Sequence, residues 1–217
     1  MSALHVFDMD GTLLRGTSAS LEIGRRIGRL SEIEVLEVAS SAGEIDNLEF
    51  HRACHPIWQT LTDQDIDAAF RGAPWLQGIA EVWADISGRG EHSVVVSMSP
   101  RFFVDRLRGW GADAVHATDV PIAGPLDEER VLTAAAKVTI VADLLRQHAL
   151  TPRDCVAYGD SYTDVPLFRA VPLSVAVNAD DEIKGLARLS YDGDDLREAY
   201  AAGRGLLQDR AVREGAG

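Results

Sequence analysis

Short apolar runs rich in β-branched residues recur along the chain, and between them lie longer segments in which apolar residues return every three or four positions. Runs of the first kind predict strands buried on both faces, whereas segments of the second kind predict amphipathic helices. The strands are predicted at 3–7, 93–97, 155–158 and 173–177, with a weaker candidate at 114–117. The helices are predicted at 100–110, 129–148 and 162–170. This alternation indicates an α/β fold in which helices cover a parallel sheet.

Residues 16–77 carry a different pattern, because they lack a convincing β run and their apolar residues have helical spacing. Turn-forming residues bound this block at 15–18 and at 71–74, where glycine and proline can act as hinges. We therefore predict a core formed by residues 1–15 and 78–217, with a helical domain of residues 16–77 inserted between its two parts.

Two shorter segments lack a regular pattern. Residues 116–126 are rich in turn-forming residues and could form a β hairpin. Residues 209–217 are polar and glycine-rich, so they are expected to fray.

The first apolar run ends in two aspartates, Asp8 and Asp10, that precede a glycine turn at Gly11. Side chains two positions apart on a strand point to the same side, so the two carboxylates would lie close together. Like charges at that separation cannot both stay ionised without a counterion. The pair therefore indicates a divalent cation together with an anionic substrate. The alternative is a strand that simply ends in an Asp-Gly turn.

Three further features follow in a fixed order. An apolar run ends at Ser97, Lys137 interrupts an apolar helical stretch, and a third apolar run leads into GDSYTD at 159–164. With DMDGT at 8–12, this set resembles the four motifs of the haloacid dehalogenase (HAD) superfamily of phosphohydrolases, in its phosphoserine-phosphatase-like branch: DxDGT, a hydrophobic run ending in Ser or Thr, a Lys, and GDSxxD. The resemblance covers nearly the whole chain. It implies a Rossmann-like, HAD-like core with a helical C1-type cap between the first two motifs, where residues 16–77 lie.

The resemblance and the chemistry of the side chains together imply hydrolysis of a phosphate ester through an aspartyl-phosphate. Asp8 is the candidate nucleophile, since a carboxylate can attack phosphorus and form an acyl phosphate. Asp10 is the candidate general acid for the leaving alcohol and then the general base that activates water. Lys137 would neutralise charge on the nucleophile and on the phosphoryl group.

Magnesium is the expected cofactor, because it prefers hard oxygen ligands. The expected metal ligands are the carboxylates of Asp8 and Asp160 and, as in the family, the backbone carbonyl of Asp10. Asp164 lies one helical turn beyond Asp160 and is expected to support the site or to reach the metal through water. The alternative for Asp164 is an acid in the first turn of a helix that offsets the helix dipole.

The phosphate group of the substrate is expected to contact Ser97, Met98, Gly11 and Lys137. Ser97 would bind through its hydroxyl, and the segment after it resembles a helix start that offers free N–H groups to an anion. Ser99 is the predicted N-cap of that helix and Pro100 its first residue.

The expected substrate is a small phosphorylated metabolite. In the phosphoserine phosphatases of this family, an acidic residue nine positions after the nucleophile recognises the substrate amine, and that position is Thr17 here. A cap arginine usually holds the substrate carboxylate, a role that Arg52 could fill. A phosphorylated sugar, alcohol or biosynthetic intermediate therefore fits at least as well as phosphoserine. A phosphotransferase with the same residues and a binding module without turnover are the alternatives.

Composition restricts the partners. The net charge is −13 and no cluster of Lys or Arg occurs, which argues against binding to nucleic acid. No apolar stretch is long enough to span a membrane, and the first apolar run is too soon interrupted by charge to be a signal peptide. The two cysteines, Cys54 and Cys155, lack metal or disulfide spacing and indicate a reducing compartment, so a cytoplasmic protein is expected. His51 and His55 have the spacing of a zinc pair, but no third soft ligand is evident.

Overall fold

The computed structural model describes residues 2–215, and the side chains of residues 2–209. Its centre is a parallel sheet of six strands in the order β3-β2-β1-β4-β5-β6. The strands are β1 (Leu4–Phe7), β2 (His92–Pro100), β3 (Ala114–Thr118), β4 (Cys155–Gly159), β5 (Leu173–Val177) and β6 (Leu189–Tyr191). The predicted α/β fold with a Rossmann-like parallel sheet is confirmed, and the weak strand candidate at 114–117 is part of it.

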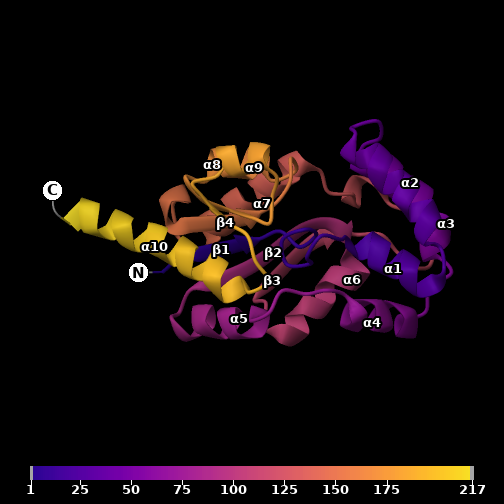
Figure 1. Cartoon of the computed structure of the whole chain (residues 1–217), viewed down its shortest axis with the longest axis horizontal. Coiled ribbons are helices and arrows are strands. Elements are labelled where there is room, and N and C mark those ends of the chain that lie inside the picture. The colour runs from indigo at the N-terminus through magenta and orange to yellow at the C-terminus, as the bar shows by residue number, and fades with distance from the viewer. Residues whose placement is uncertain (1, 216–217) are drawn as a thin grey trace.

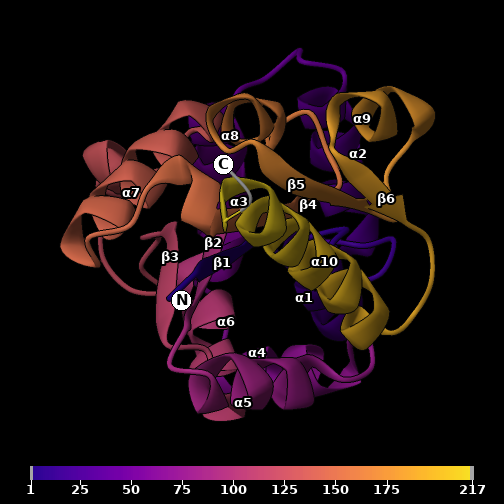
Figure 2. The same cartoon turned by 90° about the vertical axis from the view of Figure 1, so that its left-hand side faces the viewer.

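Helices cover both faces of the sheet (Figures 1 and 2). One face carries α5 (Ile79–Gly88), α6 (Arg101–Val104) and α10 (Leu196–Gly215), and the other carries α7 (Ala134–Gln147), α8 (Val165–Ala170) and α9 (Asp181–Leu186). Alternation along β1 explains this arrangement. Val6 lies in one apolar cluster with Val141 of α7, whereas Phe7 contacts Trp83 of α5 edge to face. A strand buried on both faces must be largely apolar, and the polar side chain in β1, the buried His5, has a hydrogen-bond partner at each ring nitrogen.

The helical block between β1 and β2 lies at one end of the sheet, at the right of Figure 1. It consists of α1 (Ala19–Ile27), α2 (Leu30–Ser41), α3 (Asn47–Trp58) and α4 (Asp63–Gly72). Capping boxes start α3 and α4, and Ser18 caps α1 by accepting a hydrogen bond from the backbone of Leu21. Trp58 of this block shares an apolar cluster with Val95 of β2, so packing continues from these helices into the sheet. The division into a core and a cap of residues 16–77 stays a prediction.

Several local predictions are wrong. Strand β2 continues through Pro100, and α6 starts at Arg101 without a side-chain cap, so Ser99 is not an N-cap. The pairing of Pro100 with Thr118 of β3 extends the strand and overrides the local helix-start signal. The helix predicted at 100–110 is α6 followed by a 3₁₀ helix at Asp105–Trp110.

Two further segments also differ from expectation. Residues 119–126 contain no strand, because β3 pairs only with β2 and the chain then leaves the sheet, so the hairpin prediction is wrong. The segment expected to fray continues α10 as far as Gly215, and its last two residues lie outside the described part of the chain. Within residues 2–215, no helix combines the length and apolar character needed to cross a bilayer.

Candidate active site

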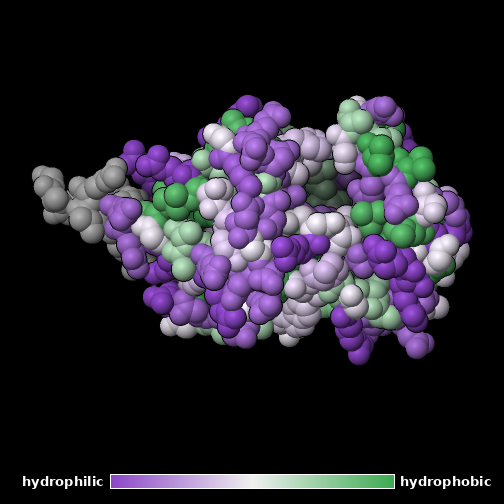
Figure 3. Space-filling model, in the orientation of Figure 1, coloured by the Kyte–Doolittle hydropathy of each residue, from purple (hydrophilic) through white to green (hydrophobic). Residues whose placement is uncertain are grey.

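The predicted functional residues lie at the carboxyl ends of three neighbouring strands. Asp8 follows β1, Ser97 lies near the end of β2, and Asp160 follows β4. This edge of a parallel sheet is where ligands bind in open α/β folds. A cavity of about 510 Å³ opens there, lined by the strand ends and by residues of α2, and Figure 3 shows the surface hollowed beside α2.

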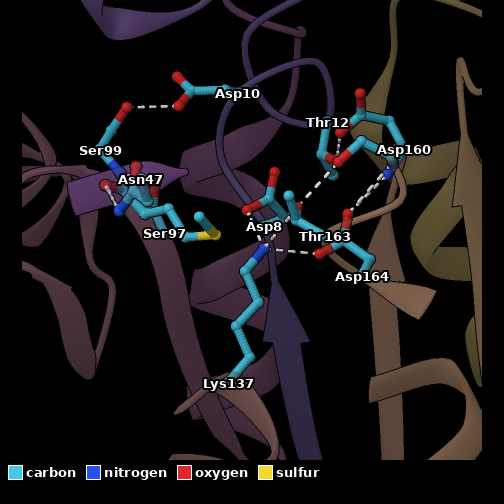
Figure 4. A network of polar contacts seen from close by, with 12 residues as sticks. Asp8, Asp10, Thr12, Asn47, Ser97, Ser99, Lys137, Asp160, Thr163 and Asp164 are labelled. Atoms are coloured by element: carbon cyan, nitrogen blue, oxygen red, sulfur yellow. Dashed lines mark hydrogen bonds and ion pairs between the residues drawn. The ribbon is translucent and has the colours of Figure 1, made fainter. Parts of the chain in front are cut away.

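A buried lysine joins two of the carboxylates (Figure 4). Lys137 Nζ lies 2.6 Å from Asp8 Oδ1 and 2.6 Å from Asp164 Oδ1, and only 1% of its side chain is exposed. Burial lowers the pKa of Lys137, but the charges of Asp164 and Asp8 outweigh it and hold that pKa above its usual value. Burial raises the pKa of Asp8 well above its usual value; Lys137 opposes this change, and the charges of the nearby carboxylates add to it.

Asp160 is held against the turn that follows β1. Thr12 Oγ1 donates a hydrogen bond of 2.9 Å to Asp160 Oδ1, and the backbone N–H of Asp160 donates to Asp164 Oδ2 over 3.1 Å. Burial raises the pKa of Asp160 to about 7, with the charge of Asp164 acting in the same direction. Gly11 has a φ of +76°, and a Cβ there would lie 2.0 Å from Asp160 Oδ2. The carboxylate therefore occupies space that any other residue at position 11 would fill.

Asp10 points toward the helical block and the end of β2. Its Oδ1 accepts a hydrogen bond of 2.8 Å from the backbone N–H of Ala19, the first residue of α1. Its Oδ2 accepts a hydrogen bond from the hydroxyl of Ser99. Burial raises the pKa of Asp10, although both hydrogen bonds oppose this change. Two donors from different elements thus orient a carboxyl group that lines the cavity.

The segment predicted to bind phosphate lies beside these carboxylates. Ser97 is buried, and its Oγ accepts a hydrogen bond of 3.1 Å from the backbone N–H of Ser99. Met98 lines the cavity, and its carbonyl oxygen accepts a hydrogen bond of 3.0 Å from Nε2 of His51. Gly11 lines the same cavity. The structure therefore brings the predicted phosphate-binding residues together near Asp8.

The two predicted substrate-selecting residues have different positions. Thr17 lines the cavity, but its hydroxyl donates a hydrogen bond of 2.8 Å to Glu22 Oε1. Arg52 does not line the cavity, and its half-exposed guanidinium forms two hydrogen bonds with Glu128, of 2.7 and 2.6 Å. The structure thus brings Thr17 to the site and leaves Arg52 outside it, where its side chain pairs with Glu128 at the surface.

Comparison with known proteins identifies the family of this chain. The model of the haloacid dehalogenase-like hydrolases matches residues 5–169, which is most of the chain. The chain belongs to this family. The resemblance seen in the four motifs is thereby confirmed, and with it the prediction that the protein is an enzyme, a phosphatase of the phosphoserine-phosphatase-like branch of the HAD hydrolases.

The similarity to individual relatives extends over almost the full chain. A protein of Idiomarina loihiensis named phosphoserine phosphatase is 27% identical over 202 residues, which is 91% of each chain. A protein of Methanocaldococcus jannaschii with the same name is 25% identical and covers 90% of this chain and 94% of its own. A substrate-bound phosphoserine phosphatase structure has a TM-score of 0.78 and 23% identity over 91% of this chain and 96% of its own. At that identity the structural likeness shows the fold alone.

The charges of this HAD site fit a divalent cation. Oxygens of Asp8, Asp160 and Asp164 lie within 4.8 Å of one another, and Lys137 is the cation in contact with two of them. Three carboxylates around one lysine leave uncompensated negative charge in a buried place. Hard carboxylate oxygens are the donors that Mg²⁺ prefers, so this donor set fits the expected metal. The structure carries no ligands, and the assignment of ligands stays a prediction.

Several residues that line the cavity were not assigned to the site by sequence reasoning. Glu37 of α2, Asn47 and His51 of α3, and Ser99 of β2 all line it. A signal existed for Ser99, which lies two positions after Ser97 on a strand and therefore on the same side. For Glu37, Asn47 and His51 no local signal existed, because the packing of α2 and α3 over the strand ends decides that they face this cavity.

Proposed function

We propose that this HAD hydrolase is a magnesium-dependent phosphomonoesterase that acts on a small phosphorylated metabolite through an aspartyl-phosphate on Asp8. The observation that supports this proposal most is the buried pair of Asp8 and Lys137, at 2.6 Å, beside the oriented carboxyl group of Asp10. A nucleophile, an acid and a fixed positive charge are the groups that phosphoryl transfer requires.

Each residue has one task in this scheme. Asp8 attacks phosphorus, so that a bond forms from its carboxylate oxygen to phosphorus while the bond from phosphorus to the alcohol oxygen breaks. Asp10 gives its proton to that alcohol, and it later takes a proton from the water that attacks the aspartyl-phosphate. Lys137 holds the Asp8 carboxylate in place and offsets the charge of the phosphoryl oxygens.

The remaining residues position these groups. Asp164 bonds to Lys137 and to the backbone N–H of Asp160, so it supports both the lysine and the adjacent carboxylate. Ser97, Met98 and Gly11 are the proposed phosphate contacts. The carboxylates of Asp8 and Asp160 and the carbonyl of Asp10 would hold Mg²⁺, which when bound offsets the charge of the phosphate and of the carboxylates.

Hydrolysis of p-nitrophenyl phosphate by the purified protein, with Mg²⁺ or with EDTA, tests this function. We expect turnover with Mg²⁺, loss of turnover with EDTA, and a loss of at least about 10³-fold in Asp8→Asn, because an amide cannot form the acyl phosphate. Asp143→Asn, the same change at an exposed position of α7, is the matched control and should keep full activity.

Mass spectrometry of acid-quenched enzyme should detect a phosphoryl group on Asp8 of the wild type and none on the Asp8→Asn variant. Near-normal turnover by Asp8→Asn, with deamidation excluded by the same mass measurement, would contradict the mechanism. Transfer of phosphate to an added alcohol in preference to water would identify a phosphotransferase.

A further inference from the structure

The cavity in front of Asp8 is lined by no lysine or arginine among the residues that the structure describes. Lys137 contacts Asp8 and Asp164 beneath it and is nearly fully buried. Arginines of the helical block pair with acids elsewhere, as Arg52 does with Glu128 and Arg25 with Glu22. A carboxylate on the leaving group of a substrate would therefore find no positive partner beyond the phosphate site.

Glu37 adds a negative group to the same cavity. Its carboxyl group is mostly buried, and its hydrogen-bond partner is the hydroxyl of Ser18, which donates to Oε1. No ion pair is formed by Glu37 within the described residues, and the charge of Asp10 also acts to raise its pKa. Burial raises the pKa of Glu37 to about 7, as expected for an acid without a cationic partner. The other oxygen of this carboxyl group is free to accept a hydrogen bond.

His51 lines the cavity but supplies no positive charge to it. Its Nε2 lies 3.0 Å from the carbonyl oxygen of Met98, which can only accept, so Nε2 carries the proton and Nδ1 is an acceptor. Nδ1 is buried and has no hydrogen-bond partner, and 1% of the residue is exposed. Burial lowers the pKa of His51 to about 4, so the ring is neutral near pH 7 and supplies no positive charge.

The amide nitrogen of Asn47, another group that lines the cavity, is already engaged. Asn47 Nδ2 donates a hydrogen bond of 2.7 Å to the carbonyl oxygen of Leu132. The cavity therefore offers the second carboxyl oxygen of Glu37 as an acceptor, without a compensating cation. A buried acceptor left without a donor is costly, so a ligand that fills the cavity should bring a donor to Glu37.

We propose that the leaving alcohol of the natural substrate carries hydrogen-bond donors, an ammonium or hydroxyl groups, and no carboxylate. The substrate class is thus an amino-alcohol or polyol phosphate, and Glu37 is the residue that selects it. This inference rests on the proposed phosphatase function. It departs from phosphoserine, the substrate in the names of the relatives, whose carboxylate would meet Glu37 without a cation.

Two pairs of substrates test the inference, since each pair differs by one carboxylate. Phosphoethanolamine lacks the carboxylate of phosphoserine, and glycerol 3-phosphate has a hydroxymethyl group in place of the carboxylate of 3-phosphoglycerate. We expect kcat/KM of the wild type to favour the member without a carboxylate by at least about tenfold in one or both pairs. The carboxylate-free substrate with the higher kcat/KM, phosphoethanolamine or glycerol 3-phosphate, identifies the donor as ammonium or hydroxyl. Preference for the carboxylate-bearing member in either pair would overturn the inference.

Variants of α2 test the role of Glu37. Glu37→Gln keeps the shape and removes the charge, so the ratio of kcat/KM for phosphoethanolamine over phosphoserine should fall on the order of tenfold. Glu34→Gln makes the same change at an exposed position of the same helix and should leave the ratio as in the wild type. An unchanged ratio in Glu37→Gln would overturn its assignment as the selecting residue.

Hydrolysis of p-nitrophenyl phosphate separates the two levels of the proposal. Turnover of this ester with Mg²⁺, combined with a preference for phosphoserine, would leave the phosphatase function standing and overturn the substrate class. Absence of turnover of this ester and of all four metabolites would overturn the phosphatase function and the substrate class together.

Discussion

The absence of a side chain at Gly11 makes room for the carboxylate of Asp160. The turn after β1 needs a positive φ at this residue, which glycine adopts without strain. It also needs an open volume, because a Cβ would lie 2.0 Å from Asp160 Oδ2. Thr12, the next residue, donates to the other oxygen of the same carboxylate. A single turn thus positions Asp8, Asp10 and Asp160 relative to one another.

Gly11→Ala should therefore lower kcat much more than the accompanying loss of stability would explain. We expect kcat to fall at least about 10²-fold, because a displacement of about 1 Å can cost that much. Gly28→Ala is the matched control, since Gly28 also has a positive φ, of +73°, but nothing lies within 4 Å of its Cβ position. Gly28→Ala should lose about 1 kcal/mol of stability and keep its kcat.

Steady-state kinetics and urea unfolding of both variants measure these effects. Equal losses of kcat in the two variants would show that backbone strain, and not the space needed by Asp160, explains the result.

At the scale of elements, α2 is the helix whose position matters most for selectivity. It buries Ile33 on one side and leaves Val35 and Val38 largely exposed on another. Glu37 lies between these sides and faces the cavity. Tyr162, in the loop after β4, donates a hydrogen bond of 3.3 Å to the carbonyl of Ser40 near the end of the helix. This contact joins α2 to the loop that carries Asp160.

The raised pKa of Glu37 predicts how α2 responds to pH. The pKa is about 7 in the folded protein, against about 4.5 for an exposed glutamate, so the folded state binds the proton more tightly. The contribution of Glu37 to the free energy of unfolding therefore falls as the pH rises from about 4.5 to about 7. Glu37→Gln removes this loss. The free energy of unfolding of the variant, relative to that of the wild type, should be about 2–3 kcal/mol higher at pH 8 than at pH 5.

Urea unfolding of the wild type, Glu37→Gln and Glu34→Gln at the two pH values measures this difference. Glu34→Gln should follow the wild type at both, because its carboxyl group is exposed. A pH-independent difference between wild type and Glu37→Gln would contradict the assignment.

For the whole molecule, the distribution of charge is the property that links stability to function. The chain carries a net charge of −13, and the acids Asp8, Asp160 and Asp164 crowd around one lysine at the end of the sheet. Without a further cation, this cluster destabilises the folded state through repulsion between buried charges. Any cation that binds there must stabilise the protein, since the unfolded chain offers no such site.

Mg²⁺ should therefore raise the melting temperature of the wild type. At a concentration 100 times the dissociation constant, binding adds about 2.7 kcal/mol to the free energy of unfolding. Asp160→Asn should melt no lower than the wild type without metal, because one repulsive charge is gone. It should respond less to Mg²⁺, because one ligand is weakened. Asp143→Asn is the control for general charge effects.

Thermal unfolding with and without Mg²⁺ measures all three proteins. A full response of Asp160→Asn to Mg²⁺ would remove Asp160 from the metal site.

Sequence reasoning succeeded where the chemistry of a residue and its place at a strand end agreed. The apolar runs around β1, β2 and β4 predicted strands that the structure contains, and parallel pairing then brings Asp8, Ser97 and Asp160 to one edge. It failed for Ser99, because a local helix-start signal could not anticipate the pairing of Pro100 with Thr118. Arg52 stays a candidate for contact with the substrate, although it pairs with Glu128, 76 positions away along the chain.

The sequence by itself determined the α/β class, the order of the motifs and the residues proposed for chemistry, because these depend on periodicity along a strand and on side-chain type. Tertiary structure alone decided what surrounds them. Lys137 meets Asp8 across 129 positions, and Glu37 and His51 reach the cavity only because α2 and α3 pack over the strand ends. Contacts of such separation depend on the packing of the whole chain, and no local pattern encodes them. The reaction could thus be inferred from motifs, whereas the substrate class could be proposed only from the folded cavity.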